Sequence, residues 1–425
     1  MTFAAIFVPD ELRDAVSDEA WLQAMLDFEG ALASAEARAG VIPQEAAQAI
    51  AASCRGDLFD AAELAAAGRR PGNPAEPLVR ALREQVVGEG AGYVHWGATS
   101  QDVMDTAAVL VSRRALVLVD REVDGVAAAC ARLARDHRGT VMAARTLLQQ
   151  AVPTTFGLKA AGWLVSLLRA RRGVRAWQPS VELGGAAGTL AALGDDGLEV
   201  LRLLAEELEL AEPAVPWHTN RVRIAELGCA LAVTAGVLAK IGRDVALLAQ
   251  TEVGEVREPP GSGGSSTMPH KRNPVGSALA VACAEQVRGC ATVLTAALVQ
   301  EHERGLGGWQ AEWGPLSQAL AYTGGAAAHV RGVLEGLEVD AERMRANLSD
   351  VIGAEHASFV LAGRVGRVEA HELIGKAART ESFRAGLLGA GLSPGDVDRV
   401  LDPSTYLGAA DAFVDRALAL YEEEW

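Results

Sequence analysis

The feature that most constrains the fold is a set of long segments in which apolar residues recur every three or four positions. In residues 103–137, Val119, Val123 and Val126 follow this spacing, which matches one face of an α-helix. Helices are predicted in the same way over residues 17–50, 155–176, 196–211, 219–256, 275–304 and 309–337. Most of these segments are apolar around most of their circumference, which is typical of helices buried in a bundle.

Composition supports an all-α fold. Of the 425 residues, 50% are hydrophobic but only 5% are aromatic, so the apolar mass comes from Ala, Leu and Val. This mixture suits long packed helices better than sheets. No strand-rich region is evident. After residue 340 the segments become shorter and more charged, with breaks at Gly389, Gly391 and Pro394, which predicts a small C-terminal helical domain.

Charge and cysteine usage restrict the partners and the compartment. A net charge of −16 argues against nucleic acid and against an anionic membrane surface as partners. The five cysteines are scattered and form no CxxC pair, as expected for reduced thiols in the cytoplasm. We find no signal peptide, and the longest uncharged apolar stretch, residues 227–239, is too short to span a bilayer. The sequence therefore predicts a cytoplasmic protein.

One polar segment stands out among the helices. Residues 264–274 combine a Ser-Ser pair, a lysine and an asparagine behind the Gly-rich run 260–264. By composition alone, a surface loop is the simpler interpretation. The alternative is chemistry at a carbon next to a carboxylate. Such chemistry needs one group that moves a proton and donors that stabilise the charge developing on the carboxylate.

The order of residues in this segment favours the interpretation that it takes part in chemistry. It resembles the GSSxMPxKxNP signature of the fumarase/aspartase superfamily and matches every fixed position. The resemblance implies an all-α, three-domain fold whose long central helices form a twenty-helix core in a homotetramer, with each active site assembled from three subunits. It also helps to place the domains at 1–105 (N-terminal helical domain), 106–340 (central long-helix bundle) and 341–425 (small C-terminal helical domain).

The same resemblance assigns roles within the loop. Ser265 matches the catalytic base of the superfamily, and its hydroxyl would need nearby cations and N–H groups to stabilise the alkoxide. Lys271 and Asn273 match positions that stabilise the aci-carboxylate intermediate, a doubly charged species. Ser266 and Met268 complete this part of the site as substrate-binding candidates.

A second polar segment, residues 95–102, precedes the first long helix. Thr99 and Ser100 followed by Asp102 make a good helix N-cap, and capping alone would explain them. Hydroxyls at a helix N-terminus can also hold a carboxylate. The segment resembles the superfamily's first conserved region, which binds a substrate carboxylate. The resemblance therefore makes Thr99 and Ser100 substrate-binding candidates, with His95 close by.

Residues 145–157 form a third polar segment, predicted to be a turn before a helix. It resembles the second superfamily region, and Thr146 and Gln149 are its substrate-binding candidates. Fumarase and adenylosuccinate lyase usually have His after Arg-Thr, where this chain has Leu147. Such a His protonates a poor leaving group as it departs. A leaving group that is itself a stable anion needs no protonation. Leu147 therefore favours a reaction in which a carboxylate or nitrite adds or departs.

Further stretches point to one branch of the superfamily. Residues 72–79, 216–221, 301–305, 309–313 and 369–373 resemble 3-carboxy-cis,cis-muconate cycloisomerases. Arg304 is either a clamp for an outer substrate carboxylate or the partner of Glu303 in an ion pair. The roles of Asn220 and Arg221 remain open, because the expected motif departs at this point.

The resemblance implies lactonisation of 3-carboxy-cis,cis-muconate, a tricarboxylate, to carboxymuconolactone in the protocatechuate branch of the β-ketoadipate pathway. No cofactor is expected, and no Cys/His cluster suggests a metal. One alternative is a lyase with an anionic leaving group, such as a nitrosuccinate lyase that gives fumarate and nitrite. Adenylosuccinate lyase is a weaker alternative because of Leu147. A non-catalytic structural role is the remaining one, and the intact set of Ser265, Lys271 and Asn273 argues against it.

Overall fold

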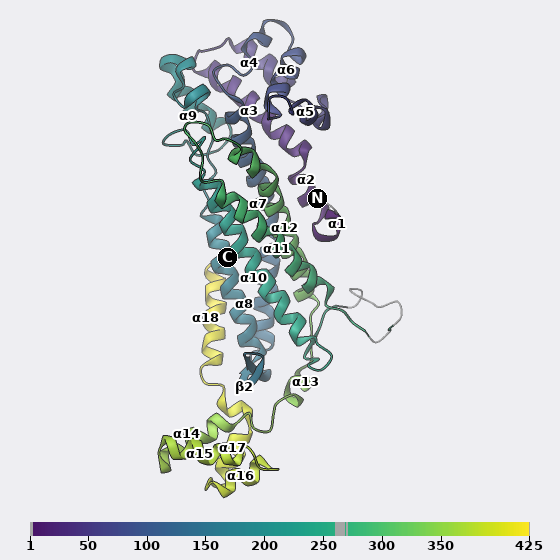
Figure 1. Cartoon of the computed structure of the whole chain (residues 1–425), viewed down its shortest axis with the longest axis vertical. Coiled ribbons are helices and arrows are strands. Elements are labelled where there is room, and N and C mark those ends of the chain that lie inside the picture. Colours follow the sequence, from purple (N-terminus) through teal and green to yellow (C-terminus); the bar gives the residue numbers. More distant parts are fainter. Residues whose placement is uncertain (1–2, 260–267, 269–270, 425) are drawn as a thin grey trace. The chain divides into compact units, whose positions relative to one another are not determined.

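The computed structural model describes residues 3–259, 268 and 271–424, and these residues are mainly helical (Figure 1). The helices are α1 (Ala4–Phe7), α2 (Asp10–Ala15), α3 (Asp18–Arg38), α4 (Gln44–Ser53), α5 (Ala61–Ala67), α6 (Ala75–Gln85), α7 (Ser100–Asp136), α8 (Phe156–Arg175), α9 (Gly197–Glu207), α10 (Val222–Leu248), α11 (Val275–Ala296), α12 (Gly308–Glu335), α13 (Ala341–Ala346), α14 (Ala354–Val365), α15 (Arg367–Ala377), α16 (Phe383–Gly389), α17 (Pro394–Leu401) and α18 (Ala410–Glu423). The strands are β1 (Val141–Thr146), β2 (Gln149–Thr155), β3 (Val256–Arg257) and β4 (Glu338–Val339).

The chain divides into two compact units. The first consists of Met1–Val123, Ala170–Ala239 and Leu279–His329. The second consists of Asp124–Arg169, Lys240–Ala278 and Val330–Trp425. The boundaries predicted near 105 and 340 are not among these limits, and the three-domain division stays a prediction.

Helix α3 shows how the sequence specifies the helices of the first unit. Ser17 caps it by accepting a hydrogen bond from the backbone N–H of Ala20 at 3.2 Å, and two acidic residues occupy its first turn. Both features satisfy or complement the free N–H groups at a helix N-terminus. Leu22, Leu26 and Phe28 are buried, so the apolar side of α3 forms part of the core.

Helix α10 belongs to the buried part of the bundle. Leu227, Leu231, Leu238 and Ile241 recur at helical spacing and are completely buried. By length and composition alone, α10 is the one helix among the described residues that is long and apolar enough to cross a membrane. The core helix of a soluble bundle has the same composition. We interpret α10 as such a helix.

Residues 145–157 differ from the predicted polar turn. They form most of an antiparallel hairpin in which β1 pairs with β2. Leu147 and Leu148 occupy the two-residue turn with φ values of 49° and 64°, which is the left-handed pair that this kind of hairpin turn requires. Because Asn and Gly usually fill such a turn, two leucines gave no signal for it. Thr155 caps α8 by accepting from the N–H of Leu158 at 3.1 Å.

Several helices are shorter than predicted: the segment 17–50 divides into α3 and α4, and α9 ends at Glu207 instead of residue 211. Helix α10 ends at Leu248, because the following turn closes with Gly254 at a φ of 62° and the N–H of Glu255 donating to the carbonyl of Leu248 at 2.9 Å. Helix α11 ends at Ala296. The residues after it form a loop that carries Arg304 to the first-unit site described below.

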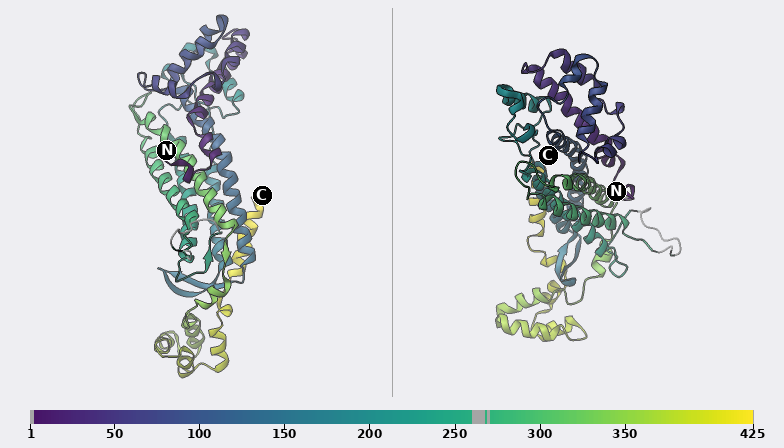
Figure 2. Two further views of the ribbon diagram at one scale, coloured as in Figure 1. Left: turned by 90° about the vertical axis from the view of Figure 1, so that its right-hand side faces the viewer. Right: turned by 45° about the horizontal axis from the view of Figure 1, so that its top comes forward.

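Helices α14 to α17 form a small cluster in the second unit (Figure 2). Its core contains Leu361, Ile374, Phe383, Leu387 and Val397. Helix α18 leaves this cluster and pairs with the end of α7, where Arg138 forms a salt bridge with Asp415.

Candidate active site

The start of α7 is organised by the buried carboxylate of Asp102. Its oxygens accept from the backbone N–H groups of Thr99 at 2.9 Å, Gly184 at 3.0 Å and Gly185 at 3.0 Å. His218 lies 2.6 Å away through Nε2. Asp102 therefore joins the helix N-terminus to two other parts of the first unit.

Thr99 and Ser100 lie at this helix N-terminus and are partly exposed. The cap is made by the side chain of Asp102 and not by either hydroxyl. Within the described part of the chain, neither hydroxyl has a hydrogen-bond partner. Both are thus free to bind an anion together with the N–H groups of the first turn.

Glu182 adds a second acid to the cluster around His218. Its Oε2 accepts from the N–H of Trp217 at 2.6 Å, and its Oε1 lies 3.4 Å from Nε2 of His218. Burial, reinforced by the charges of Asp102 and Asp105, raises the pKa of Glu182 to about 9. Glu182 is therefore a neutral acid at pH 7.

Asp102, Glu182 and His218 bring ligand atoms within 4.8 Å of one another, close enough to hold a metal ion. Hydrogen bonding explains the arrangement better. Both oxygens of Asp102 face backbone N–H donors, whose positive ends would oppose a cation. We interpret the cluster as a hydrogen-bonding network that fixes the position of Thr99.

The state of Glu182 makes stability depend on pH. Its pKa rises on folding, from 4.5 to about 9, so the stability it contributes is fully present below pH 4.5 and is lost as the pH approaches 9. We expect the thermal midpoint of the wild type to fall across this range more steeply than that of Glu182→Gln, which is always neutral. Glu226→Gln, on an exposed position of α10, is the control and should keep the wild-type slope. Equal slopes for wild type and Glu182→Gln would show that Glu182 is ionised when folded.

Arg304 reaches the same region from the loop after α11. Its guanidinium donates to the carbonyls of Gly185 at 2.7 Å, Ala186 at 3.1 Å and Glu303 at 2.8 Å. No ion pair with the Glu303 carboxylate is present among the described residues. Arg304 and Thr99 are thereby connected, since Gly185 also donates to Asp102. The side chain positions the loop that contains Gly185, and its predicted role as a substrate clamp stays a prediction.

Gly185 is required at its position in this loop. It has a φ of 66°, and a Cβ there would lie 2.9 Å from the carbonyl oxygen of Gly97. Only glycine combines this conformation with so close an approach. The loop is therefore held tightly against the segment that leads into α7.

His95 lies in that leading segment, with a φ of 63°. Its Nδ1 is 2.7 Å from Oε1 of Glu29, whose side chain is completely buried. Burial lowers the pKa of His95, but the charge and hydrogen bond of Glu29 outweigh it and raise the pKa overall. The carboxylate of Glu29 therefore favours the protonated form of His95, which lies in the segment that leads to the predicted anion site.

The role of Arg221, which the sequence left open, is to bind two buried carboxylates. Its guanidinium is 1% exposed and pairs with Asp105 at 2.7 Å and Glu312 at 2.6 Å. Asp105 also accepts from the indole N–H of Trp309 at 2.9 Å. These contacts join α7, the start of α10 and α12 inside the first unit. Asn220 is exposed, and its Oδ1 accepts from the N–H of Val222 at 3.4 Å.

Thr146 and Gln149 belong to the second unit, where they face each other at the exposed end of the β1–β2 hairpin. The neighbouring Arg145 donates to the buried carboxylate of Glu255 at 2.6 Å and 3.0 Å. Asn347 donates to the same carboxylate at 2.9 Å. This buried acceptor anchors the hairpin and leaves its tip exposed.

The signature loop is described only at its end, also in the second unit. Ser265 and Ser266 lie outside the described residues. Lys271 and Met268 are exposed, and Asn273 is partly exposed. Glu258 accepts from the N–H groups of Gly276 at 3.0 Å and Ser277 at 2.9 Å, so it caps α11 directly after the loop.

The chain is similar to known proteins over most of its length. A family model described as Lyase matches residues 8–289. The chain is 49% identical to a 3-carboxy-cis,cis-muconate cycloisomerase of Pseudomonas aeruginosa, covering 98% of this chain and 95% of the relative. It is 47% identical to a nitrosuccinate lyase of Streptomyces davaonensis, covering 95% and 91%.

The chain is also similar to a solved structure in both sequence and fold. The crystal structure of 3-carboxy-cis,cis-muconate lactonizing enzyme from Pseudomonas putida is 44% identical and covers 99% of each chain, with a TM-score of 0.92. The all-α fold class and the resemblance to the superfamily are both confirmed by these matches. The chain belongs to this lyase family, the fumarase/aspartase superfamily of enzymes.

Proposed function

We propose that the enzyme is a cycloisomerase that lactonises 3-carboxy-cis,cis-muconate to carboxymuconolactone in the β-ketoadipate pathway. The observation that carries this proposal is the similarity of almost the whole chain, at 49% identity, to a protein of that activity. Leu147 supports it, because a fully exposed apolar side chain at the hairpin tip cannot protonate a departing hydroxide or amine. A carboxylate nucleophile needs no such acid.

In the proposed reaction, one carboxylate of the substrate attacks an alkene carbon of the same molecule. The electron pair of that double bond moves into a neighbouring carboxylate, which becomes an aci-carboxylate. Lys271 and Asn273 stabilise its charge, and Ser265 then delivers a proton to the α-carbon. Because the nucleophile is internal, holding the flexible diene in a reactive conformer contributes about 7–11 kcal/mol to lowering the barrier.

Thr99 and Ser100 are the proposed anchors for a substrate carboxylate. Their hydroxyls lack hydrogen-bond partners in the described part of the molecule. Both residues lie at the N-terminus of a 37-residue helix, α7. Asp102 fixes this terminus through Thr99. His95, Thr146, Gln149, Ser266, Met268 and Arg304 are proposed to line the rest of the site.

The enzyme is proposed to act as a soluble, cytoplasmic homotetramer with each site shared by three subunits. Only half of the most apolar window of α10 is buried in a single chain. Val117 on α7 and Val233 on α10 are 67% and 58% exposed. Covering such helix faces with other copies of the chain is favourable by about 25 cal/mol per Å² of apolar surface buried.

The proposal is tested by following the ultraviolet absorbance of the conjugated diene of 3-carboxy-cis,cis-muconate. We expect rapid loss of absorbance on addition of the purified enzyme, with one lactone formed per diene consumed. No turnover by a folded protein would contradict the cycloisomerase assignment.

Release of nitrite and fumarate from nitrosuccinate is the second candidate activity, favoured by the relative of 47% identity. Leu147 is compatible with it, because nitrite is also a stable anion. Turnover of nitrosuccinate without loss of the diene would establish this lyase activity instead. Adenylosuccinate, run in parallel, is expected to be inert.

A further inference from the structure

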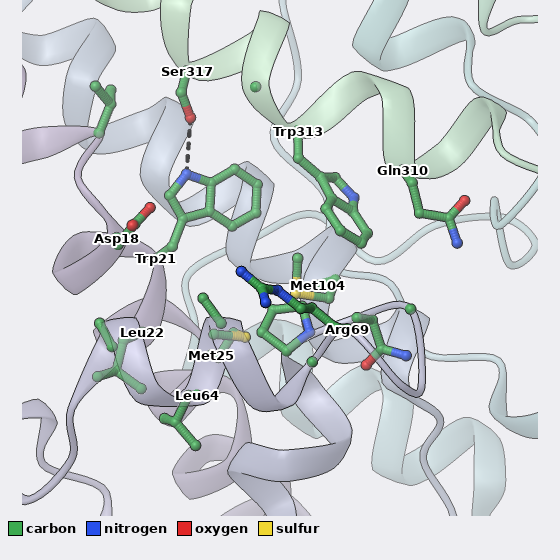
Figure 3. Close-up of a pocket in the computed structure, with 18 of the residues that line it drawn as sticks. Asp18, Trp21, Leu22, Met25, Leu64, Arg69, Met104, Gln310, Trp313 and Ser317 are labelled. Carbon is green, nitrogen blue, oxygen red and sulfur yellow. Dashed lines mark hydrogen bonds between the residues drawn. The ribbon is translucent and has the colours of Figure 1, made fainter. Parts of the chain in front are cut away.

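The first unit contains a cavity of about 620 Å³ that none of the predicted site residues lines. Trp21, Met25, Met104 and Trp313 form its apolar walls (Figure 3). The indole N–H of Trp21 donates to the hydroxyl of Ser317 at 2.9 Å, which fixes one indole. Two indoles and two methionines present flat, polarizable surfaces, which suit a planar unsaturated ligand.

A cation reaches into this apolar space. Figure 3 shows the side chain of Arg69 extending into the region surrounded by Trp21, Trp313 and Met104. Arg69 has no ion pair and no side-chain hydrogen bond with any described residue. Such an arginine at an apolar cavity favours an anionic group, and a planar carboxylate matches its fork of N–H donors.

The indole of Trp313 lines the cavity, but its N–H group is not accessible from it. The Nε1 atom of Trp313 is buried and has no hydrogen-bond partner among the described residues. Trp313 therefore contributes its indole surface to the wall, and Arg69 is the cation available to anionic oxygens.

The cavity lies beside the predicted anion site. Met104 follows Ser100 by four residues on α7, so the two side chains lie on the same helix face, separated by about 6 Å along the axis. A ligand anchored at Ser100 by one carboxylate can therefore extend along this face into the cavity. Arg304 is occupied by three carbonyls, whereas Arg69 has no such partner.

We propose that this cavity is the subsite for the part of the substrate farthest from the reacting carbon, with Arg69 binding its outer carboxylate and the indoles contacting its conjugated chain. This inference rests on the proposed function, since it assigns a planar, conjugated polycarboxylate as the substrate class. The six-carbon chain of muconate extends farther along this face from Ser100 than a four-carbon succinate does. The subsite therefore selects the longer unsaturated substrates.

The test compares Arg69→Gln with Arg70→Gln, because Arg70 is the adjacent exposed arginine and does not line the cavity. Binding of isophthalate, an unreactive planar dicarboxylate, is measured by calorimetry on the full-length protein. We expect Arg69→Gln to weaken binding about tenfold, as for one charge-assisted hydrogen bond. Arg70→Gln should bind like the wild type. Equal affinities for wild type and Arg69→Gln would overturn the proposal.

Kinetics separate this inference from the proposed function. With 3-carboxy-cis,cis-muconate, Arg69→Gln should raise KM about tenfold and leave kcat nearly unchanged, since the outer carboxylate is bound equally in ground and transition states. Unchanged KM in an enzyme that lactonises the substrate would refute the subsite and leave the function standing. Arg69-dependent binding of isophthalate without lactonisation would refute the function and leave the subsite standing.

Discussion

Replacing Ser265 with alanine should lower kcat for diene loss by about 10²–10⁴-fold, the usual contribution of a general acid or base. The alanine removes the hydroxyl that is proposed to deliver the proton to the α-carbon. KM should change little, because this proton moves only in the transition state. The measurement is the initial rate of ultraviolet absorbance loss for wild type and variant at the same enzyme concentration.

Ser262→Ala provides the matched control for this experiment. Ser262 lies in the same Gly-rich stretch but outside the signature positions, and its replacement should leave kcat at the wild-type level. Substantial activity in Ser265→Ala would assign the proton transfer to another group. Equal losses in both variants would indicate that the loop as a whole was disturbed.

Replacing Arg221 with methionine should destabilise the protein by about 3–5 kcal/mol, the usual effect of breaking a buried ion pair on one side. The methionine fills similar space but leaves the carboxylates of Asp105 and Glu312, which are 2% and 3% exposed, without their cation. We expect a large fall in the urea midpoint of unfolding, monitored by circular dichroism.

Arg202→Met is the control for Arg221→Met. Arg202 forms its ion pairs with Glu199 and Glu206 on the exposed face of α9, where all three side chains are about half exposed. Solvent screens these pairs, so the urea midpoint should not change measurably. A small effect of Arg221→Met would mean that water enters the cluster and solvates the two carboxylates, contrary to this expectation.

Local sequence patterns determined the helices and their approximate limits. The apolar spacing that predicts a helix over 155–176 corresponds to α8, at Phe156–Arg175. This spacing is a property of neighbouring residues, since one helix face repeats every three or four positions. The β1–β2 hairpin could not be predicted in this way. Its turn residues Leu147 and Leu148 adopt left-handed conformations, which leucine rarely takes, and no local pattern indicates them.

For the candidate site, the sequence by itself identified the segments predicted to be catalytic or substrate-binding. These segments are clusters of polar residues that interrupt long apolar helical segments. Only the tertiary structure revealed the cluster that positions Thr99. Glu182 and His218 lie 80 and 116 residues after Asp102 in the chain, and nothing in their local sequence links them. Likewise, Arg69 and Trp313 share one cavity from distant segments. Such contacts arise only when the helices pack, because burial then forces each polar group to find a partner or leaves it available for a ligand.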